Sequence, residues 1–278
     1  MKKFAVLGYP IGHSMSPLLH NEIFRMKGLA HSYEAVLMPP EQLEGEFPSL
    51  KDKFAGFNCT IPLKEKVIPL LDTVSSHARE LGSVNTVKCD NGITYGTSTD
   101  TEGFLRSLSA HNVSLKGKTV LIVGCGGVAR VIAIACAREG CNITIALRSP
   151  EKALTLIKEI ESLCGVTPTA TALSSITGSF DLLVQCTPVG MYPNISSCPV
   201  SDEVIKNCHA VFDTVYNPIK TLILQKAELF GKTAIGGLEM LVYQGLASEE
   251  VWLGLTFTKE ESDHLISLLE EKLKEGTK

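Results

Sequence analysis

A glycine-rich loop in the middle of the chain limits the fold more than any other feature. The loop, residues 124–129, reads Gly-Cys-Gly-Gly-Val-Ala between the apolar, β-branched stretch 119–123 and an apolar helix expected over 127–139. A buried parallel strand, a tight glycine turn and a helix in this order are typical of a dinucleotide-binding unit, whose helix N-terminus receives the pyrophosphate. The predicted cofactor contacts of this loop are Gly124, Gly126, Gly127, Val128 and Ala129.

The end of the next predicted strand, 142–147, indicates which dinucleotide is bound. Arg148 follows Gly124 by 24 residues (148 − 124), about where an acidic residue would hold the ribose of NAD, and no Asp or Glu is present there. Arg148, Ser149 and Lys152 could instead bind a 2′-phosphate through charge-assisted hydrogen bonds. The sequence therefore predicts NADP, although Arg148 could also be a solvated arginine at a strand end.

Strand-like and helix-like stretches alternate along the whole chain, which favours an α/β fold with parallel sheets. Ser16-Pro17 is expected to open a helix with Ser16 as N-cap, and Asn91-Gly92 is a hairpin signal. A helix running from Thr99 toward Ala110 is the candidate crossover between two domains. Strands are expected over 4–7, 32–37, 54–58, 84–87, 93–95, 119–123, 142–147, 181–185 and 210–213, and helices over 64–71, 73–81, 127–139, 150–163 and 221–230.

Composition excludes several classes of protein. The 278 residues carry a formal net charge of −4, which argues against nucleic-acid and membrane-surface partners. No apolar run reaches the ~18 residues of a membrane span. The nine cysteines are scattered, as expected of reduced thiols in the cytoplasm, and the seven histidines show no metal-ligand spacing.

Four polar clusters beside Gly and Pro mark the first hundred residues as the source of the substrate site: 8–17, 58–64, 82–86 and 99–100. Ser14 and Ser16 offer hydroxyls near a helix N-terminus, where a carboxylate could bind. Lys64 offers a proton donor, and Asp100 offers an acceptor that could orient both Lys64 and a substrate hydroxyl. Taken singly, each has a structural explanation, because serines cap helices, Asp100 could support a first turn, and most lysines are solvated.

Together, and in this order ahead of a glycine loop, the four clusters resemble the shikimate dehydrogenase family. The resemblance continues at 213–218, similar to the family's Asp-x-x-Tyr-x-Pro, and at 237–244, similar to its Gly-x-x-Met-Leu-x-x-Gln. The chain departs from the family pattern at Ser98, Leu147 and Gln185-Cys186, where Asn is usual. None of these departures removes a proposed catalytic group.

The resemblance implies NADPH-dependent, metal-free reduction of 3-dehydroshikimate to shikimate, in chorismate and aromatic amino-acid biosynthesis. It implies a substrate domain formed by 1–102 and 238–278, into which a Rossmann-type NADP domain, 103–237, is inserted. Lys64 and Asp100 would be the catalytic pair. The substrate-binding residues would be Ser14, Ser16, Thr60, Asn85, Tyr216 and Gln244. Further cofactor contacts would come from Thr187, Met191, Thr214 and Gly237.

Two alternatives remain open at this point. The chain could be a quinate/shikimate dehydrogenase, although Ser14 and Ser16 favour shikimate because the extra hydroxyl of quinate would crowd that corner. It could also be a non-catalytic NADPH-binding sensor, against which the presence of Lys64 and Asp100 argues. The expected partner is a small-molecule substrate, and either a monomer or a homodimer is compatible with the sequence.

Overall fold

The computed structural model describes residues 1–12 and 14–276, and the chain divides into two compact units. The first unit comprises Met1–Glu102 and Val242–Leu269, and the second comprises Gly103–Leu241 and the chain from Glu270 onward. This division by contacts falls at 102/103, at 241/242 and at 269/270, and the predicted domains, 1–102 with 238–278 and 103–237, stay a prediction. Which unit binds substrate and which binds cofactor stays a prediction.

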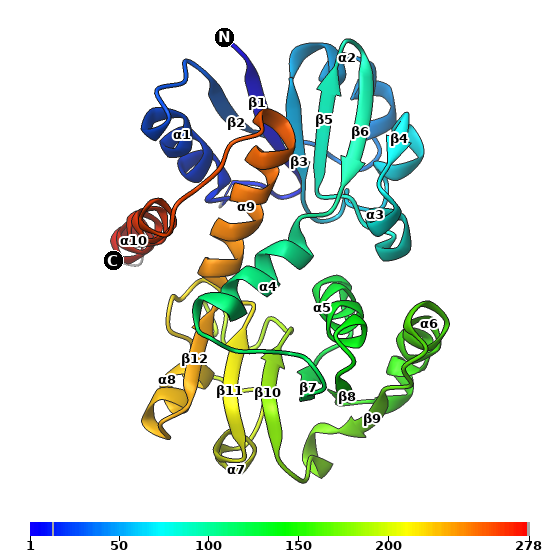
Figure 1. The fold of residues 1–278 in the computed structure, drawn as a ribbon, viewed down its shortest axis with the longest axis vertical. Helices are drawn as coiled ribbons and strands as arrows, with labels where there is room; N and C mark the ends of the chain where they lie inside the picture. The colour runs from blue at the N-terminus through cyan, green and yellow to red at the C-terminus, as the bar shows by residue number, and fades with distance from the viewer. Residues whose placement is uncertain (13, 277–278) are drawn as a thin grey trace. The chain divides into compact units, whose positions relative to one another are not determined.

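The first unit contains a six-stranded sheet (Figure 1). Its strands are β1 (Lys3–Gly8), β2 (Ser32–Leu37), β3 (Gly56–Cys59), β4 (Thr73–Val74), β5 (Thr86–Asp90) and β6 (Ile93–Thr97). Their order is β2-β1-β3-β5-β6-β4. Parallel sheets were predicted, but this sheet is mixed. The hairpin predicted at Asn91-Gly92 is confirmed, and it makes β5 and β6 antiparallel. Both turn residues have positive φ (51° and 79°), as in a type I′ turn.

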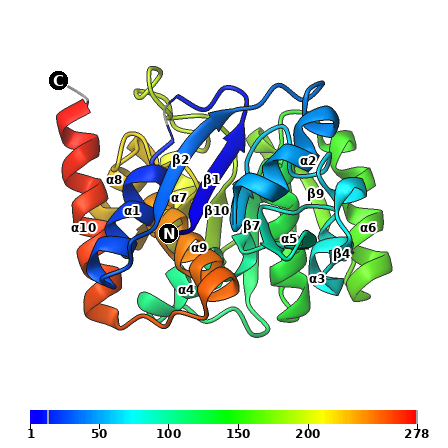
Figure 2. The same cartoon turned by 90° about the horizontal axis from the view of Figure 1, so that it is seen from above.

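The side chains of β1 alternate between two buried faces of this sheet. Ala5 and Leu7 pack in a core cluster with the apolar side of α2 (Leu43–Lys53), whereas Phe4 and Val6 pack in another. The second cluster also contains Phe24, Tyr33 and Trp252. Figure 2 shows α2 and α1 (Ser16–Met26) on opposite sides of β1. A strand that is buried on both faces has a continuous apolar sequence, and this is why the sequence predicts a strand at 4–7.

Helix α1 begins one residue earlier than expected, so the assignment of Ser16 as N-cap was wrong. Met15 occupies the N-cap position, and Pro17 lies in the first turn as predicted. The backbone N–H of Ser16 donates to Ser14 Oγ at 3.3 Å, so the earlier serine satisfies a free N–H group at this helix start.

Two predicted short helices are also wrong in part. Residues 64–71 form successive turns with one 3₁₀ turn, Ile68–Leu70, because the Lys64 carbonyl accepts from the Val84 N–H (2.9 Å) and is not free for a helical bond. The helix expected over 73–81 is shortened to α3 (Ser76–Leu81), since β4 precedes it and pairs with β6. Helix α2 was not predicted, and Pro48 interrupts its sequence pattern.

The second unit contains a six-stranded, fully parallel sheet. Its strands are β7 (Thr119–Val123), β8 (Asn142–Leu147), β9 (Thr169–Ala172), β10 (Phe180–Gln185), β11 (Cys208–Asp213) and β12 (Thr233–Gly236). Their order, β12-β11-β10-β7-β8-β9, is that of a Rossmann fold. The chain reverses direction across the sheet between β7 and β10, and ligands of such folds bind at the carboxyl ends of the strands at this switch point.

The remaining helices connect or cover these strands. They are α4 (Asp100–Ala110), α5 (Gly127–Arg138), α6 (Leu154–Cys164), α7 (Asp202–Lys206), α8 (Leu222–Leu229), α9 (Gly237–Leu253) and α10 (Lys259–Gly276). Helix α5 contacts β7 and β8, and α8 contacts β11 and β12. Helix α10 begins with a capping box, because Thr258 N–H donates to Glu261 Oε2 (2.9 Å) and Glu261 N–H donates to Thr258 Oγ1 (3.3 Å).

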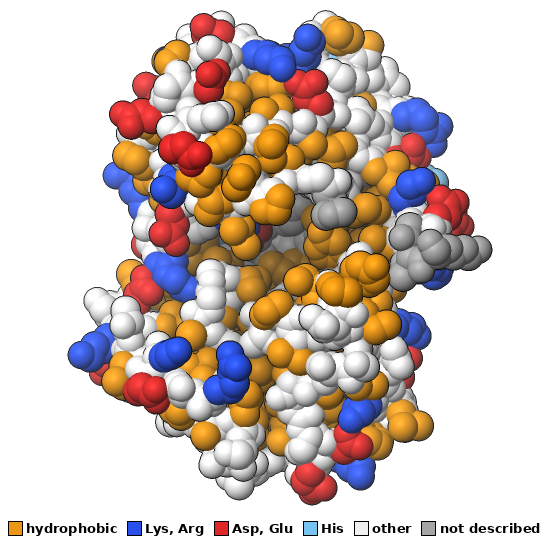
Figure 3. Space-filling view, turned by 180° about the vertical axis from the view of Figure 1, so that it is seen from behind, with side chains coloured by type: hydrophobic (Ala, Val, Ile, Leu, Met, Phe, Trp, Pro, Cys, Tyr) orange, Lys and Arg blue, Asp and Glu red, His pale blue; other side chains and the backbone are white. Residues whose placement is uncertain are grey.

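The surface carries charges of both signs. On the face drawn in Figure 3, Lys and Arg side chains lie among Asp and Glu side chains rather than in one basic area. This agrees with the net charge of −4. Among the described residues, no helix is long and apolar enough to cross a bilayer.

Candidate active site and cofactor loop

Lys64 and Asp100, the predicted catalytic pair, are in direct contact. Lys64 Nζ donates to Asp100 Oδ2 at 2.6 Å, and the two side chains are 28% and 13% exposed. Lys64 lies in the turns after β3, next to the fully buried Leu63, and Asp100 is the first residue of α4. The ammonium group is thus fixed by a short bond, and both side chains remain partly exposed to solvent.

The side chain of Asn85 connects this pair to α9. Its Nδ2 lies 2.9 Å from Asp100 Oδ1, 3.0 Å from Thr99 Oγ1 and 3.3 Å from Gln244 Oε1. Its Oδ1 accepts from the Thr99 N–H at 2.8 Å. Lys64, Asn85, Asp100 and Gln244 were all predicted site residues, and the fold brings them into one hydrogen-bonded group.

A layer of buried polar residues supports this group, and none of them was predicted as an individual site residue. Asn58 Nδ2 donates to the Asn85 carbonyl (3.0 Å) and lies 3.1 Å from both Thr86 Oγ1 and Ser248 Oγ. Tyr33 donates its hydroxyl hydrogen to Asn58 Oδ1 at 2.6 Å. Burial raises the pKa of Tyr33 well above its usual value, with the negative charge of Glu249 as the next cause. The sequence signals for this layer were the polar clusters 58–64 and 82–86, which contain Asn58 and Thr86, whereas Tyr33 and Ser248 lie outside every cluster.

The other predicted substrate residues of the first unit lie at the ends of two elements. Ser14 and Ser16 are at the start of α1, where Ser14 Oγ accepts from the Ser16 N–H at 3.3 Å and Pro17 has no N–H. Thr60 directly follows β3, and its N–H donates to the Leu7 carbonyl at 2.9 Å. These positions are compatible with the predicted roles, which no contact in the structure tests.

The glycine loop combines a tight turn at Gly124 with open space at Gly126 and Gly127. Gly124 has φ +112°, and a Cβ there would lie 3.0 Å from Thr187 Cγ2 and 3.1 Å from the Cys186 carbonyl oxygen. By contrast, a Cβ at Gly126 or Gly127 would meet no atom within 4 Å. Helix α5 has no side-chain N-cap and no acidic residue in its first turn. Its free N–H groups and open surroundings therefore fit an anionic group of a dinucleotide.

Arg148, Ser149 and Lys152 lie directly after β8, beside the position expected for the adenosine ribose. The Arg148 and Lys152 side chains are exposed. No ion pair within residues 1–12 and 14–276 involves either side chain. Unpaired cations at this position fit a 2′-phosphate.

Gln185 forms hydrogen bonds that hold the loop containing Thr187. It is one of the positions at which the chain departs from the family pattern. The Gln185 side chain is fully buried, and its Nε2 donates to Thr187 Oγ1 (2.9 Å) and to the Val189 carbonyl (3.1 Å). Its Oε1 accepts from the Thr187 N–H at 3.1 Å. Met191, further along this loop, is 45% exposed. The Gln side chain therefore supplies the loop contacts expected of an amide at this position.

The segment after β11 is held by a buried carboxylate. Asp213 Oδ2 accepts from Thr221 Oγ1 at 2.6 Å, and its Oδ1 accepts from the Val215 N–H at 3.0 Å. Burial raises the pKa of Asp213 to about 6, although both hydrogen bonds oppose this shift. A Cβ at Gly237 would lie 2.3 Å from the Thr214 carbonyl oxygen, so only glycine fits beside Thr214.

Tyr216 follows this segment in the second unit, and burial raises the pKa of its hydroxyl. Its predicted place near Ser14 and Ser16 stays a prediction.

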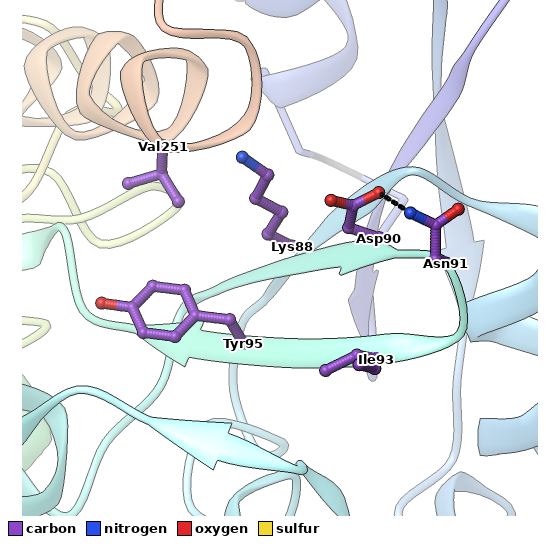
Figure 4. Close-up of a pocket in the computed structure, with 6 residues that line it drawn as sticks. All are labelled: Lys88, Asp90, Asn91, Ile93, Tyr95 and Val251. Atoms are coloured by element: carbon purple, nitrogen blue, oxygen red, sulfur yellow. Dashed lines mark hydrogen bonds between the residues drawn. The ribbon is translucent and has the colours of Figure 1, made fainter.

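A surface pocket of about 560 Å³ lies on the β5–β6 hairpin. Figure 4 shows Lys88 and Tyr95 extending from the two strands toward Val251 of α9, and Asn91 bonded to Asp90. None of the predicted site residues lines this pocket. Within residues 1–12 and 14–276, no group of three or more His, Cys, Asp or Glu side chains could hold a metal ion.

Comparisons with known proteins agree with this geometry. The family model of the shikimate dehydrogenase substrate-binding domain matches residues 6–87, and that of shikimate/quinate 5-dehydrogenase matches residues 107–192. Shikimate dehydrogenase (NADP(+)) of Methanopyrus kandleri is 40% identical over 258 residues, which are 90% of this chain and 89% of that relative. The Caldanaerobacter subterraneus protein of the same name is 36% identical over 93% of this chain and 94% of its own length.

A solved structure supports the same assignment. Shikimate 5-dehydrogenase from Thermus thermophilus, crystallised with NADP(H) and shikimate, has a TM-score of 0.86 and 35% sequence identity. The match covers 96% of this chain and 99% of that one. The resemblance seen in the sequence motifs is thereby confirmed, and the chain belongs to the shikimate dehydrogenase family.

Proposed function

We propose that this protein is an NADP-dependent shikimate dehydrogenase that reversibly reduces 3-dehydroshikimate to shikimate in aromatic amino-acid biosynthesis. The observation that carries the proposal is the 2.6 Å bond between Lys64 and Asp100, joined through Asn85 to Gln244. The names of the relatives, shikimate dehydrogenase (NADP(+)), support the reaction and the cofactor.

NADPH supplies the hydride when it is bound. Lys64 donates a hydrogen bond to the substrate ketone oxygen and delivers the proton as negative charge develops there. Asp100 orients the ammonium group through the 2.6 Å bond and stabilises its positive charge. Because Lys64 is 28% exposed, solvent can restore its proton after each turnover.

The remaining groups of the first unit orient the substrate. Ser14 and Ser16 bind the carboxylate through their hydroxyl groups at the N-terminus of α1, whose positive end favours an anion. Asn85, Gln244 and Thr60 bind the ring hydroxyls. Tyr216 completes the substrate contacts.

The second unit binds the cofactor. The N-terminus of α5, with its open surroundings at Gly126 and Gly127, receives the pyrophosphate. Arg148, Ser149 and Lys152 bind the 2′-phosphate. Val128 and Ala129 continue the loop contacts. The nicotinamide region is formed by Thr187, Met191, Thr214 and Gly237.

The decisive experiment is shikimate-dependent reduction of NADP by the purified protein, measured at the NADPH absorbance band beside matched reactions with NAD and with quinate. We expect the highest kcat/KM for the pair NADP and shikimate. Equal kcat/KM values for quinate and shikimate would favour the quinate/shikimate alternative. Cofactor binding without turnover of either acid would favour a sensor.

We further propose a cytoplasmic location and a monomer or homodimer. All nine cysteines are free, as suits a reducing compartment. Light scattering on the purified protein measures the assembly directly.

A further inference from the structure

A buried histidine–glutamate pair in the first unit takes no part in the steps described above. His20 Nδ1 and Glu249 Oε1 lie 2.6 Å apart, and both side chains are fully buried. The other polar atoms of the two groups, His20 Nε2 and Glu249 Oε2, have no hydrogen-bond partner among the described residues. Apolar residues can often replace a buried polar or charged pair without loss of stability, so packing alone does not explain this hydrogen-bonded pair.

The pair joins two helices at their point of close approach. His20 lies on α1 and Glu249 on α9, and Gly245 of α9 faces α1. A Cβ at Gly245 would lie 2.5 Å from Leu19 Cδ2 and 3.6 Å from His20 Nε2. Contacts between apolar side chains leave some freedom to slide or rotate, whereas a short hydrogen bond fixes direction as well as distance.

Both helices carry predicted substrate contacts close to this bond. Ser14 and Ser16 lie at the start of α1, and Gln244 immediately precedes Gly245 on α9. Glu249 is adjacent to Ser248, whose Oγ lies 3.1 Å from Asn58 Nδ2 and whose hydrogen bonds to Thr86 and Thr99 are buried. The register of α1 against α9 therefore sets the distance between the carboxylate site and the hydroxyl site.

The imidazole of His20 also supports the polar layer through Tyr33. The two rings are stacked, with centroids 4.1 Å apart and planes inclined by 6°. Tyr33 in turn donates to Asn58 Oδ1 at 2.6 Å. His20 thus contacts the polar layer under Asn85 through Tyr33. Its partner Glu249 is linked to the same layer through the neighbouring residue, Ser248.

We propose that His20 and Glu249 are positioning residues that hold α1 in register with α9, so that Ser14 and Ser16 face the same substrate molecule as Gln244 and Asn85. This inference rests on the proposed function, because the aligned groups are those predicted to bind shikimate.

The test uses the double variant His20→Leu/Glu249→Met, which keeps the interior filled and leaves no unpaired buried charge, and the single variant Glu249→Gln, which keeps the hydrogen bond. We expect the double variant to raise the KM and the calorimetric dissociation constant for shikimate at least about tenfold, with the KM for NADP changed less than about twofold. We expect Glu249→Gln to stay within about threefold of wild type for shikimate. Thermal unfolding of each variant shows that the protein compared is folded.

Lys27→Met is the matched control, because the Lys27–Glu261 ion pair (2.6 Å) also ties α1 to a C-terminal helix, α10, but involves none of the proposed site residues. It should leave the KM for shikimate unchanged. A folded double variant with a wild-type KM for shikimate would overturn the inference, as would an equal rise in the KM of both substrates. Absence of shikimate turnover in the wild-type protein would instead refute the proposed function, which separates the two failures.

Discussion

In the first unit, protein atoms hold the side chain of Asn85, which is predicted to bind substrate. Both the nitrogen and the oxygen of its amide form hydrogen bonds. A buried layer of Asn58, Thr86 and Ser248 supports this residue. In the second unit, the glycine loop has almost no side chains to hold, and its shape comes from one positive φ at Gly124 and from open space at Gly126. One site is thus built from side chains that occupy their positions before a ligand arrives. The other is built from backbone that leaves room for the ligand.

This difference has a physical origin. A ring that carries several hydroxyls is recognised by directional bonds, and buried polar groups recognise it best when their own geometry is fixed. A pyrophosphate is recognised by charge and by N–H groups of a helix end, for which side chains would be in the way. Substitutions in the two regions should therefore fail in different ways.

The largest effect is expected for Lys64→Ala, which removes the proposed proton donor from a position that is not in the core. We expect kcat for shikimate oxidation to fall by about 10² or more, with a smaller change in KM. Steady-state kinetics with NADP measures both constants. Lys66→Ala, at an exposed lysine two residues away, should behave like wild type. Wild-type kcat in Lys64→Ala would exclude this residue as the donor.

Gly126→Ala tests whether open space is what the cofactor loop provides. The added methyl group meets no protein atom within 4 Å, so thermal stability should change little. It would, however, stand where the pyrophosphate approaches, and the KM for NADP should rise at least about tenfold. Calorimetric binding of shikimate should be unaffected. A variant with normal NADP affinity would show that the phosphate does not pack against this glycine.

Arg148→Ala tests whether Arg148 selects NADPH over NADH. Loss of the exposed guanidinium should raise the KM for NADPH more than about tenfold and leave that for NADH nearly unchanged, because only NADPH carries the 2′-phosphate. Lys158→Ala, on the nearby helix α6, serves as a charge-matched control. Equal effects on both cofactors would contradict the assignment of Arg148.

The smallest effect is expected at Asp213, the buried carboxylate of the second unit. Its pKa is raised to about 6 in the folded protein, so the folded state keeps a proton that the unfolded state has lost. The free energy of unfolding therefore decreases as the pH rises through this pKa, by about 1 kcal/mol between about pH 5 and 6.5. Asp213→Asn should remove that part of the slope in urea unfolding at several pH values. An identical slope in both proteins would show that Asp213 is ionised throughout.

Much of the second unit could be predicted because its signals are local. The strand, the glycine turn and the helix that follow one another at 119–139 are each specified by neighbouring residues, and all three are found in the structure. Predictions failed where distant partners intervened. The turns at 64–71 depend on Val84, and β4 exists because it pairs with β6.

The candidate site shows the same limit. The motifs and the family resemblance singled out Lys64, Asn85, Asp100 and Gln244 and paired Lys64 with Asp100. Nothing in the sequence showed that Asn85 would bond to both Asp100 and Gln244. Asn85 and Gln244 are 159 positions apart, and His20 and Glu249 are 229 apart. Ser248 carries no motif at all.

The sequence by itself determined the Rossmann-type unit, the class of cofactor and the family, because turn chemistry, strand composition and motif order are properties of short segments. Only the tertiary structure decided how the first unit becomes a site. It bonds Gln244 of α9 to Asn85, encloses the polar layer under Asn85 and buries the His20–Glu249 pair between two helices. These features arise from packing between distant segments, where burial makes each unmade hydrogen bond costly, and a linear pattern does not specify them.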